Sequence, residues 1–103
     1  MRNRKTVTGL QVSHTNELEG GRNHYSIGRI TAASGWRAAN APGAENDRLA
    51  AMQALIREAE EYDADAIIGL DFEVDAIKRP DIDGAPLRRV AASGIAVKFA
   101  QAA

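Results

Sequence analysis

Residues 64–77 read ADAIIGLDFEVDAI, and this stretch decides the fold. From Leu70 to Ala76 apolar and acidic residues alternate, so the two kinds of side chain point to opposite faces of an extended strand. Residues 90–99, VAASGIAVKF, form a second strand-like segment. The residues between the two segments are rich in proline, aspartate and glycine, which favour turns. The pattern predicts a β-hairpin with a connection of about nine residues, against roughly two to five in most hairpins.

Two weaker strand patterns and one helical pattern precede the hairpin. Residues 7–15 and 25–32 are strand-like, and residues 34–43 are irregular because glycine, asparagine and proline interrupt them. Residues 1–6 are expected to be a flexible tail ahead of a single domain, residues 7–103. The order β-β-α-β-β predicts a small α+β domain with a mainly antiparallel sheet and one amphipathic helix.

The helical pattern runs from residue 46 to residue 62. Asn46 or Asp47 is the expected N-cap, because such side chains accept hydrogen bonds from the first free amides of a helix. Asp63 tolerates the left-handed conformation that often ends a helix, so we expect the helix to stop near residues 62–64. Apolar residues recur at three- and four-residue spacing and are predicted to pack on the sheet. These residues are Leu49, Met52, Ile56 and Ala59.

The composition narrows the functional class. The chain has 103 residues, a net charge of −1 and no cysteine. The balanced charge gives no support for a nucleic-acid or membrane partner, and the missing thiols exclude disulfides and thiolate metal sites. No apolar run approaches the roughly 20 residues that span a bilayer. No hydrophobic segment follows the basic first residues as in a secretory signal. We therefore expect a cytoplasmic protein.

Three motifs, taken in order, resemble the YbjQ-like family of small bacterial proteins, which is described as "putative heavy-metal-binding". The strongest motif is ADAIIGLDF at residues 64–72, and the second is ASGIAV at residues 92–97. The third combines LEG at residues 18–20 with IGRI at residues 27–30. Together they extend the resemblance over most of residues 10–100.

The resemblance implies a ring-shaped homo-oligomer, usually a pentamer, in which strands assemble across subunits, and it implies no established activity. One departure lies at residues 34–47, which replace the Gly-Gly-Arg-Ser segment and the helix-start tyrosine that the family usually has. Trp36 lies in this segment, where a small monomer would offer it little cover, and burial between subunits is favoured. Gly69 and Gly94 lie within strands, where another backbone, a subunit or a flat ligand could come close. We expect the partner of the chain to be a second copy of itself.

Two histidines are candidate ligands for a divalent transition metal. His14 and His24 are the only imidazoles of the chain. On neighbouring strands of a first hairpin they would be close enough to share a zinc or nickel ion. The alternative is two surface or interface histidines, because no ligand spacing such as His-x-x-x-His is present.

An acidic row on the strand of residues 70–76 is the second candidate. Asp71, Glu73 and Asp75 share one face and offer oxygen ligands to a cation. The alternative is that Arg88 or Arg89 pairs with them, because opposite charges across two strands stabilise sheets.

The leading functional hypothesis is a non-enzymatic homo-oligomeric module that binds a small ligand or a metal between subunits. The alternative is a heavy-metal-binding protein that uses histidine and carboxylate ligands. An enzyme has little support, because the serines lack a base-and-carboxylate constellation and no glycine-rich phosphate loop is present. An active site built from residues of two chains would not be recognisable in a single sequence.

Overall fold

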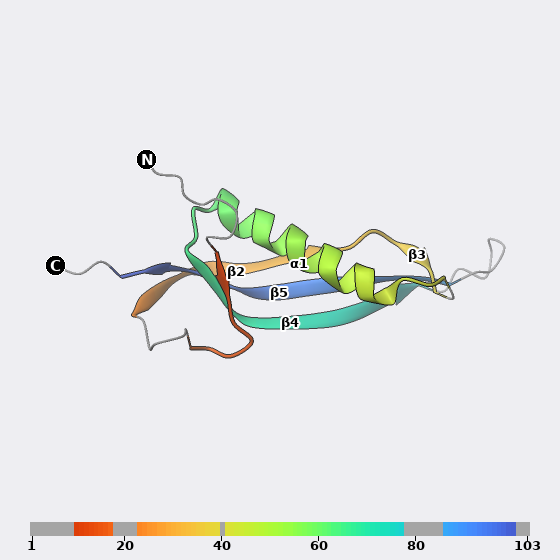
Figure 1. Cartoon of the computed structure of the whole chain (residues 1–103), viewed down its shortest axis with the longest axis horizontal. Coiled ribbons are helices and arrows are strands. Elements are labelled where there is room, and N and C mark those ends of the chain that lie inside the picture. Colours follow the sequence, from red (N-terminus) through yellow and green to blue (C-terminus); the bar gives the residue numbers. More distant parts are fainter. Residues whose placement is uncertain (1–9, 18–22, 40, 78–85, 101–103) are drawn as a thin grey trace.

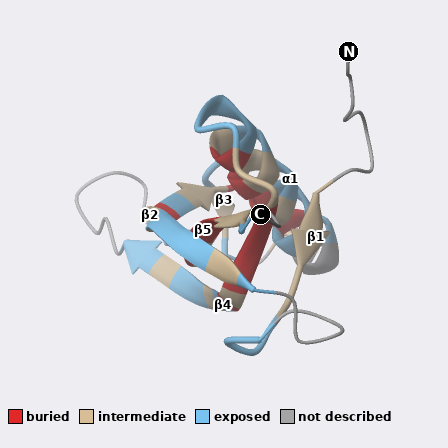
Figure 2. Cartoon of the chain, turned by 90° about the vertical axis from the view of Figure 1, so that its left-hand side faces the viewer, coloured by how far each residue is buried: buried red, intermediate tan, exposed pale blue. Residues whose placement is uncertain are grey.

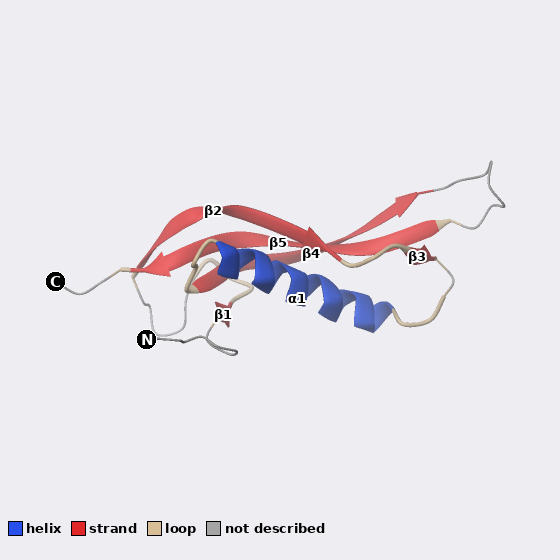
Figure 3. Ribbon diagram, turned by 90° about the horizontal axis from the view of Figure 1, so that it is seen from above, coloured by secondary structure: helices blue, strands red, loops and turns tan. Residues whose placement is uncertain are grey.

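One helix lies across one face of a five-stranded sheet, which gives two layers (Figure 1, Figure 3). The computed structural model describes residues 10–17, 23–39, 41–77 and 86–100. The predicted α+β class is confirmed for these residues, and the predicted tail of residues 1–6 lies outside them. In chain order the elements are β1 (Gln11–Val12), β2 (His24–Ala33), β3 (Arg37–Ala38), α1 (Ala44–Glu61), β4 (Ala66–Ile77) and β5 (Leu87–Phe99).

The predicted hairpin is present and occupies the centre of the sheet. β4 and β5 pair in antiparallel register, from Ala66 opposite Val97 to Ile77 opposite Leu87. Because side chains alternate along each strand, one half of them faces α1. The other half faces the side of the sheet away from α1, which we call the open face.

β4 contains a bulge that separates its buried first half from its second half, where the acidic residues lie. The pairing register shifts between Ile68 and Asp71, and Gly69 within this shift has a left-handed φ of 64°, which glycine adopts without steric cost. The shift brings Ile67 and Leu70, three positions apart, into the same core cluster. Because one extra residue reverses the alternation, the acids that follow point to the open face and not under the helix.

The first two strands do not form the hairpin that the sequence predicted. The strand order is β1-β4-β5-β2, with β1 parallel to β4 and β2 antiparallel to β5. β1 and β2 therefore lie at opposite edges of a mixed sheet. β3 falls in the segment predicted to be irregular and pairs with β5. The physical reason is that β5 and the apolar first half of β4 take the centre, where they are covered best, and the shorter or more polar segments take the edges.

The helix begins at Ala44, and its N-cap is Gly43 in place of the predicted Asn46 or Asp47. Gly43 has a φ of 106°, and no side chain caps the helix. Asp47 is instead buried in the first turn, where Nε and Nη2 of Arg37 donate to its Oδ1 at 2.9 and 2.7 Å. The aspartate that resembled a cap thus anchors the start of α1 to β3.

The end of α1 agrees with the prediction. Tyr62 is the C-cap, and Asp63 has a left-handed φ of 59°. The amide of Ala64 donates to the carbonyl of Ala59 at 3.1 Å, which satisfies a carbonyl at the helix end. Lys98 Nζ donates to the carbonyl of Asp63 at 2.7 Å, which joins this turn to β5.

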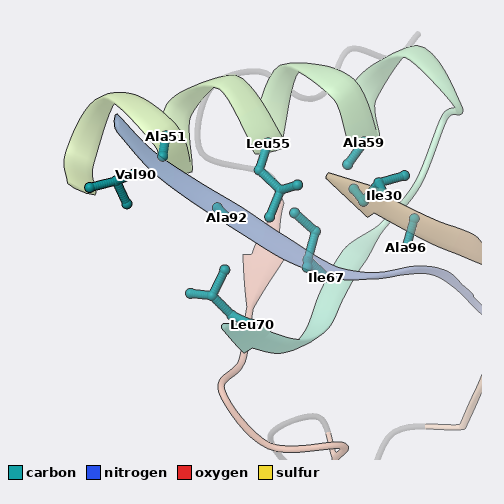
Figure 4. Packing of buried hydrophobic residues seen from close by; sticks show 9 residues of the cluster. All are labelled: Ile30, Ala51, Leu55, Ala59, Ile67, Leu70, Val90, Ala92 and Ala96. Atoms are coloured by element: carbon teal, nitrogen blue, oxygen red, sulfur yellow. The ribbon is translucent and has the colours of Figure 1, made fainter. Parts of the chain in front are cut away.

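The larger of two buried clusters lies between α1 and the sheet, but the helix is rotated relative to the predicted stripe (Figure 4). Ala51, Leu55 and Ala59 are fully buried, whereas Leu49 is 55% exposed. Met52 and Ile56 are only partly buried at the margin of the core. A row containing two alanines lets the helix approach the sheet closely, and this rotates Leu49 outward. The buried partners of α1 in this cluster are Ile30, Ile67, Leu70, Val90, Ala92 and Ala96.

Candidate functional site

The structure does not bring the two histidines together. His14 is exposed just after β1, and His24 is partly buried at the start of β2. The two strands lie at opposite edges of the sheet, and three strand spacings of about 4.8 Å separate them by roughly 14 Å. The predicted neighbourhood of the histidines across a hairpin is therefore wrong. The reason is that a strand pattern does not reveal which strand it pairs with.

The acidic row lies on the open face of β4, as its alternation predicted. Arg89 Nε donates to Asp75 Oδ2 at 3.1 Å, so the cross-strand pairing given as the alternative is present for this residue. Arg88 takes no part, because it stands opposite Ala76 on the helix side. Asp71 and Glu73 are exposed and form no ion pair with the residues that the structure describes.

A metal site within one copy is not apparent. No group of three histidine, aspartate or glutamate side chains gathers around one point in the described ranges. The side chains of Asp71 and Glu73 are about 7 Å apart along an extended strand, which is too wide for both to bind one ion unaided at about 2.0 to 2.6 Å. Any cation held here would need further ligands, for example from a second copy.

Two long edges of the sheet are unpaired within the part of the chain that the structure describes. β2 extends over ten residues and pairs only with β5. β1 pairs with β4 at Ala66 and Ile67. The backbone N–H groups of Gly69 and Leu70 donate hydrogen bonds to the segment after β1, so the outer side of β4 is paired as far as Leu70. Residues 71–77 of β4 have no strand on their outer side in these ranges. Such edges expose unpaired amides and carbonyls that accept another strand.

Apolar side chains are exposed beside both edges. On β2, Tyr25 is 56% exposed and Ile27 is 37% exposed, and on β4 Val74 is 58% exposed. Figure 2 shows exposed residues along β2, and it shows β4 changing from buried to exposed toward its end. α1 packs mainly on β2 and β5. The outer part of β4 is therefore left with little cover, apart from Arg48, whose guanidinium lies 4.4 Å from the Phe72 ring.

Trp36 forms a second exposed feature between β2 and β3. The indole is 40% exposed, and the guanidinium of Arg89 lies 4.6 Å from its ring. Because Arg89 also binds Asp75, the three side chains form one chain of contacts across the sheet. The sequence located Trp36 in a poorly covered link but gave no indication of its cationic neighbour, which only the pairing of β4 with β5 reveals.

Sequence reasoning also missed the importance of β2. Residues 24–33 contain neither proline nor lysine, the residues that commonly protect an edge strand from further pairing. This absence was visible in the sequence, but its meaning depends on knowing that the strand is at an edge.

Comparison with known protein families identifies the family to which this chain belongs. Residues 5–100 match the model of the YbjQ-like family, whose description is "putative heavy-metal-binding". The chain therefore belongs to this family, and the resemblance carried by its three motifs is confirmed. The described residues include no helix that is long and apolar enough to cross a membrane.

A solved structure has the same fold. It is the crystal structure of a protein of unknown function from Pediococcus pentosaceus, assigned to the DUF74 family, which is the same family. The two chains are 14% identical with a TM-score of 0.61, over 90% of this chain and 100% of the other. At this identity the likeness concerns the fold alone. A search of curated protein sequences found no match.

Proposed function

We propose that this protein is a non-enzymatic module that assembles with copies of itself into a ring. The family resemblance implies five copies. The observation that carries the proposal is the pair of edges that no further strand of the described residues covers, β2 on one side and residues 71–77 of β4 on the other. A long unprotected edge is a hazard to a monomer, and pairing it with another copy removes the hazard.

The exposed side chains near these edges support the same proposal. Tyr25, Val74 and Trp36 are each 40% exposed or more, and burial of aromatic and aliphatic anchors contributes much of the energy of protein interfaces. A small ligand or a metal bound between copies fits this arrangement, because Asp71 and Glu73 lie exposed at an edge that a second copy would approach.

The test is the mass of the native protein in solution. We expect light scattering at micromolar concentration to report a stable oligomer, and native mass spectrometry of protein purified from cells to report its number of copies and any retained ligand. A stable monomer in both measurements would contradict the proposal.

Binding of a heavy metal is the second candidate, and the description of the family favours it. Without cysteine the available ligands are imidazoles and carboxylates, which suit zinc or nickel better than softer heavy metals. In this proposal the ligands are His14, His24 and the acidic row Asp71, Glu73 and Asp75, contributed by more than one copy.

A further inference from the structure

We infer that the copies join head to tail, with the outer edge of β2 of one copy beside the outer edge of β4 of the next, and with Arg29 of the first facing Asp71 and Glu73 of the second. The inference rests on the proposed self-assembly and names the contact that forms it. Arg29 is exposed and forms no ion pair with the described residues, as is true of the two acids.

Both partners lie on the same face of the sheet. Arg29 stands opposite Ile95 on β5, and Asp71 and Glu73 stand opposite Ser93 and Ala91. These β5 residues alternate with those that pack against α1, so all of them belong to the open face. If a second copy continues the sheet across the β2–β4 junction, its open face continues as well. Because β2 and β4 both run antiparallel to β5, they meet there as parallel strands about 4.8 Å apart, and the arginine and the acids become cross-strand neighbours.

Charge also decides against the symmetric alternative. If β4 paired with β4 of a second copy, two acidic rows would meet, and like charges opposite each other are destabilising. Pairing β2 with β4 instead brings Arg29 to Asp71 and Glu73, none of which forms an ion pair among the described residues. A contact between two different edges leaves one free edge on each terminal copy, so it generates a closed ring or an open filament. The acidic row therefore selects against a two-fold dimer formed through β4.

The helix side of the same junction is apolar. Val74 stands opposite Val90, on the side of the sheet that carries α1. It is 58% exposed in the single chain. Covering it at the junction would bury apolar surface on one face of the sheet while the charges pair on the other face.

Charge reversal tests the inference. Arg29→Glu, or Asp71→Lys with Glu73→Lys, should weaken assembly about tenfold or more at low salt, because each opposes like charges at the junction. Combining all three substitutions should restore assembly. The matched controls reverse exposed charges on α1, Arg57→Glu and Glu60→Lys with Glu61→Lys, and should not change the mass. Light scattering gives the mass, and circular dichroism verifies that each variant is folded.

Cross-linking provides a second measurement that does not depend on stability. The chain has no cysteine, so Arg29→Cys combined with Asp71→Cys or with Glu73→Cys introduces the only thiols. Within one copy β5 separates β2 from β4 by roughly 9.6 Å, which exceeds the reach of a disulfide, about 7 Å between Cα atoms. Oxidation should therefore give a ladder of covalent multimers, whereas Arg57→Cys with Glu73→Cys should not.

The outcomes separate the inference from the proposed function. A wild-type oligomer that keeps its mass in the charge variants and gives no ladder with either cysteine pair overturns the head-to-tail junction and leaves self-assembly standing. A wild-type monomer overturns both. Loss of assembly in the reversals, recovery in the triple variant and a covalent ladder support the junction.

Discussion

Two glycines fix the centre of the sheet at the scale of single residues. A Cβ at Gly94 would lie 2.5 Å from Ile67 Cγ2 and 3.1 Å from the carbonyl oxygen of Ile68. Gly69 forms the bulge of β4 with a positive φ, and a Cβ there would lie 3.1 Å from Asn16 Oδ1. The close approach expected at these glycines is thus made within the chain, by the bulged strand and the segment after β1. Gly94 is buried, so this position is not open to a ligand in the single copy.

We predict that Gly94→Ala destabilises the protein by about 1–3 kcal/mol, because the new methyl group must displace Ile67 and the backbone beside the bulge. The matched control is Gly35→Ala, since a Cβ there meets nothing within 4 Å and the residue lies outside β2 and β4. The melting temperature at equal protein concentration is the measurement. Equal melting temperatures for the two variants would show that the bulge relaxes without cost.

The helix is the element whose orientation the core decides. α1 is held at its start by Arg37 bound to the buried Asp47, and at its end by the turn that Lys98 binds. Between these anchors, Ala51, Leu55 and Ala59 bring it against β2 and β5. The outer half of β4 is consequently left for something other than α1 to cover.

Leu55 and Leu49 therefore make a matched pair for a stability test. Leu55→Ala is expected to cost about 2–5 kcal/mol, because it empties a fully buried position. Leu49→Ala is expected to cost about 0.5 kcal/mol or less, since the side chain is 55% exposed. Chemical unfolding of both variants gives the two free energies. A larger loss for Leu49→Ala would mean that assembly buries the outer face of the helix.

The whole molecule is one thin layer of sheet under one helix, and its chemistry depends on what other copies add. One copy offers two imidazoles on opposite edges and, on the open face, Asp71 and Glu73, which form no ion pair within the described ranges. None of these alone surrounds a cation. Only neighbouring copies could complete a coordination shell, so the two proposed functions are linked through assembly.

We predict weak binding of zinc and nickel, lost in a His14→Ala/His24→Ala double variant, because imidazoles are the best transition-metal ligands present. Calorimetry on the assembled protein measures the affinity of the wild type and of this variant. Asp75→Asn reports the contribution of the one carboxylate of the acidic row that the proposed junction does not use. Tight binding that survives the loss of both histidines would place the site on other residues.

The sequence alone determined the features that rest on local patterns. Alternation and turn residues predicted the β4–β5 hairpin, and the left-handed tolerance of Asp63 predicted the end of α1. Three motifs in order identified the family. These features depend on neighbours in the chain, whose chemistry can be read directly.

Only the tertiary structure decided which strands pair, which face of α1 is buried and what Asp47 does. Strand patterns look alike whatever their partner, so β1 and β2 appeared as a hairpin although β4 and β5 separate them. The helix has apolar residues on two adjacent rows. The row with two alanines, Ala51, Leu55 and Ala59, faces the sheet, because small side chains allow a close approach. Asp47 could have capped the helix, but Arg37, ten residues earlier, was brought within reach by β3. Each of these outcomes depends on which of several contacts between residues distant in the chain is the most stable. A pattern along the sequence does not give the relative stability of such contacts.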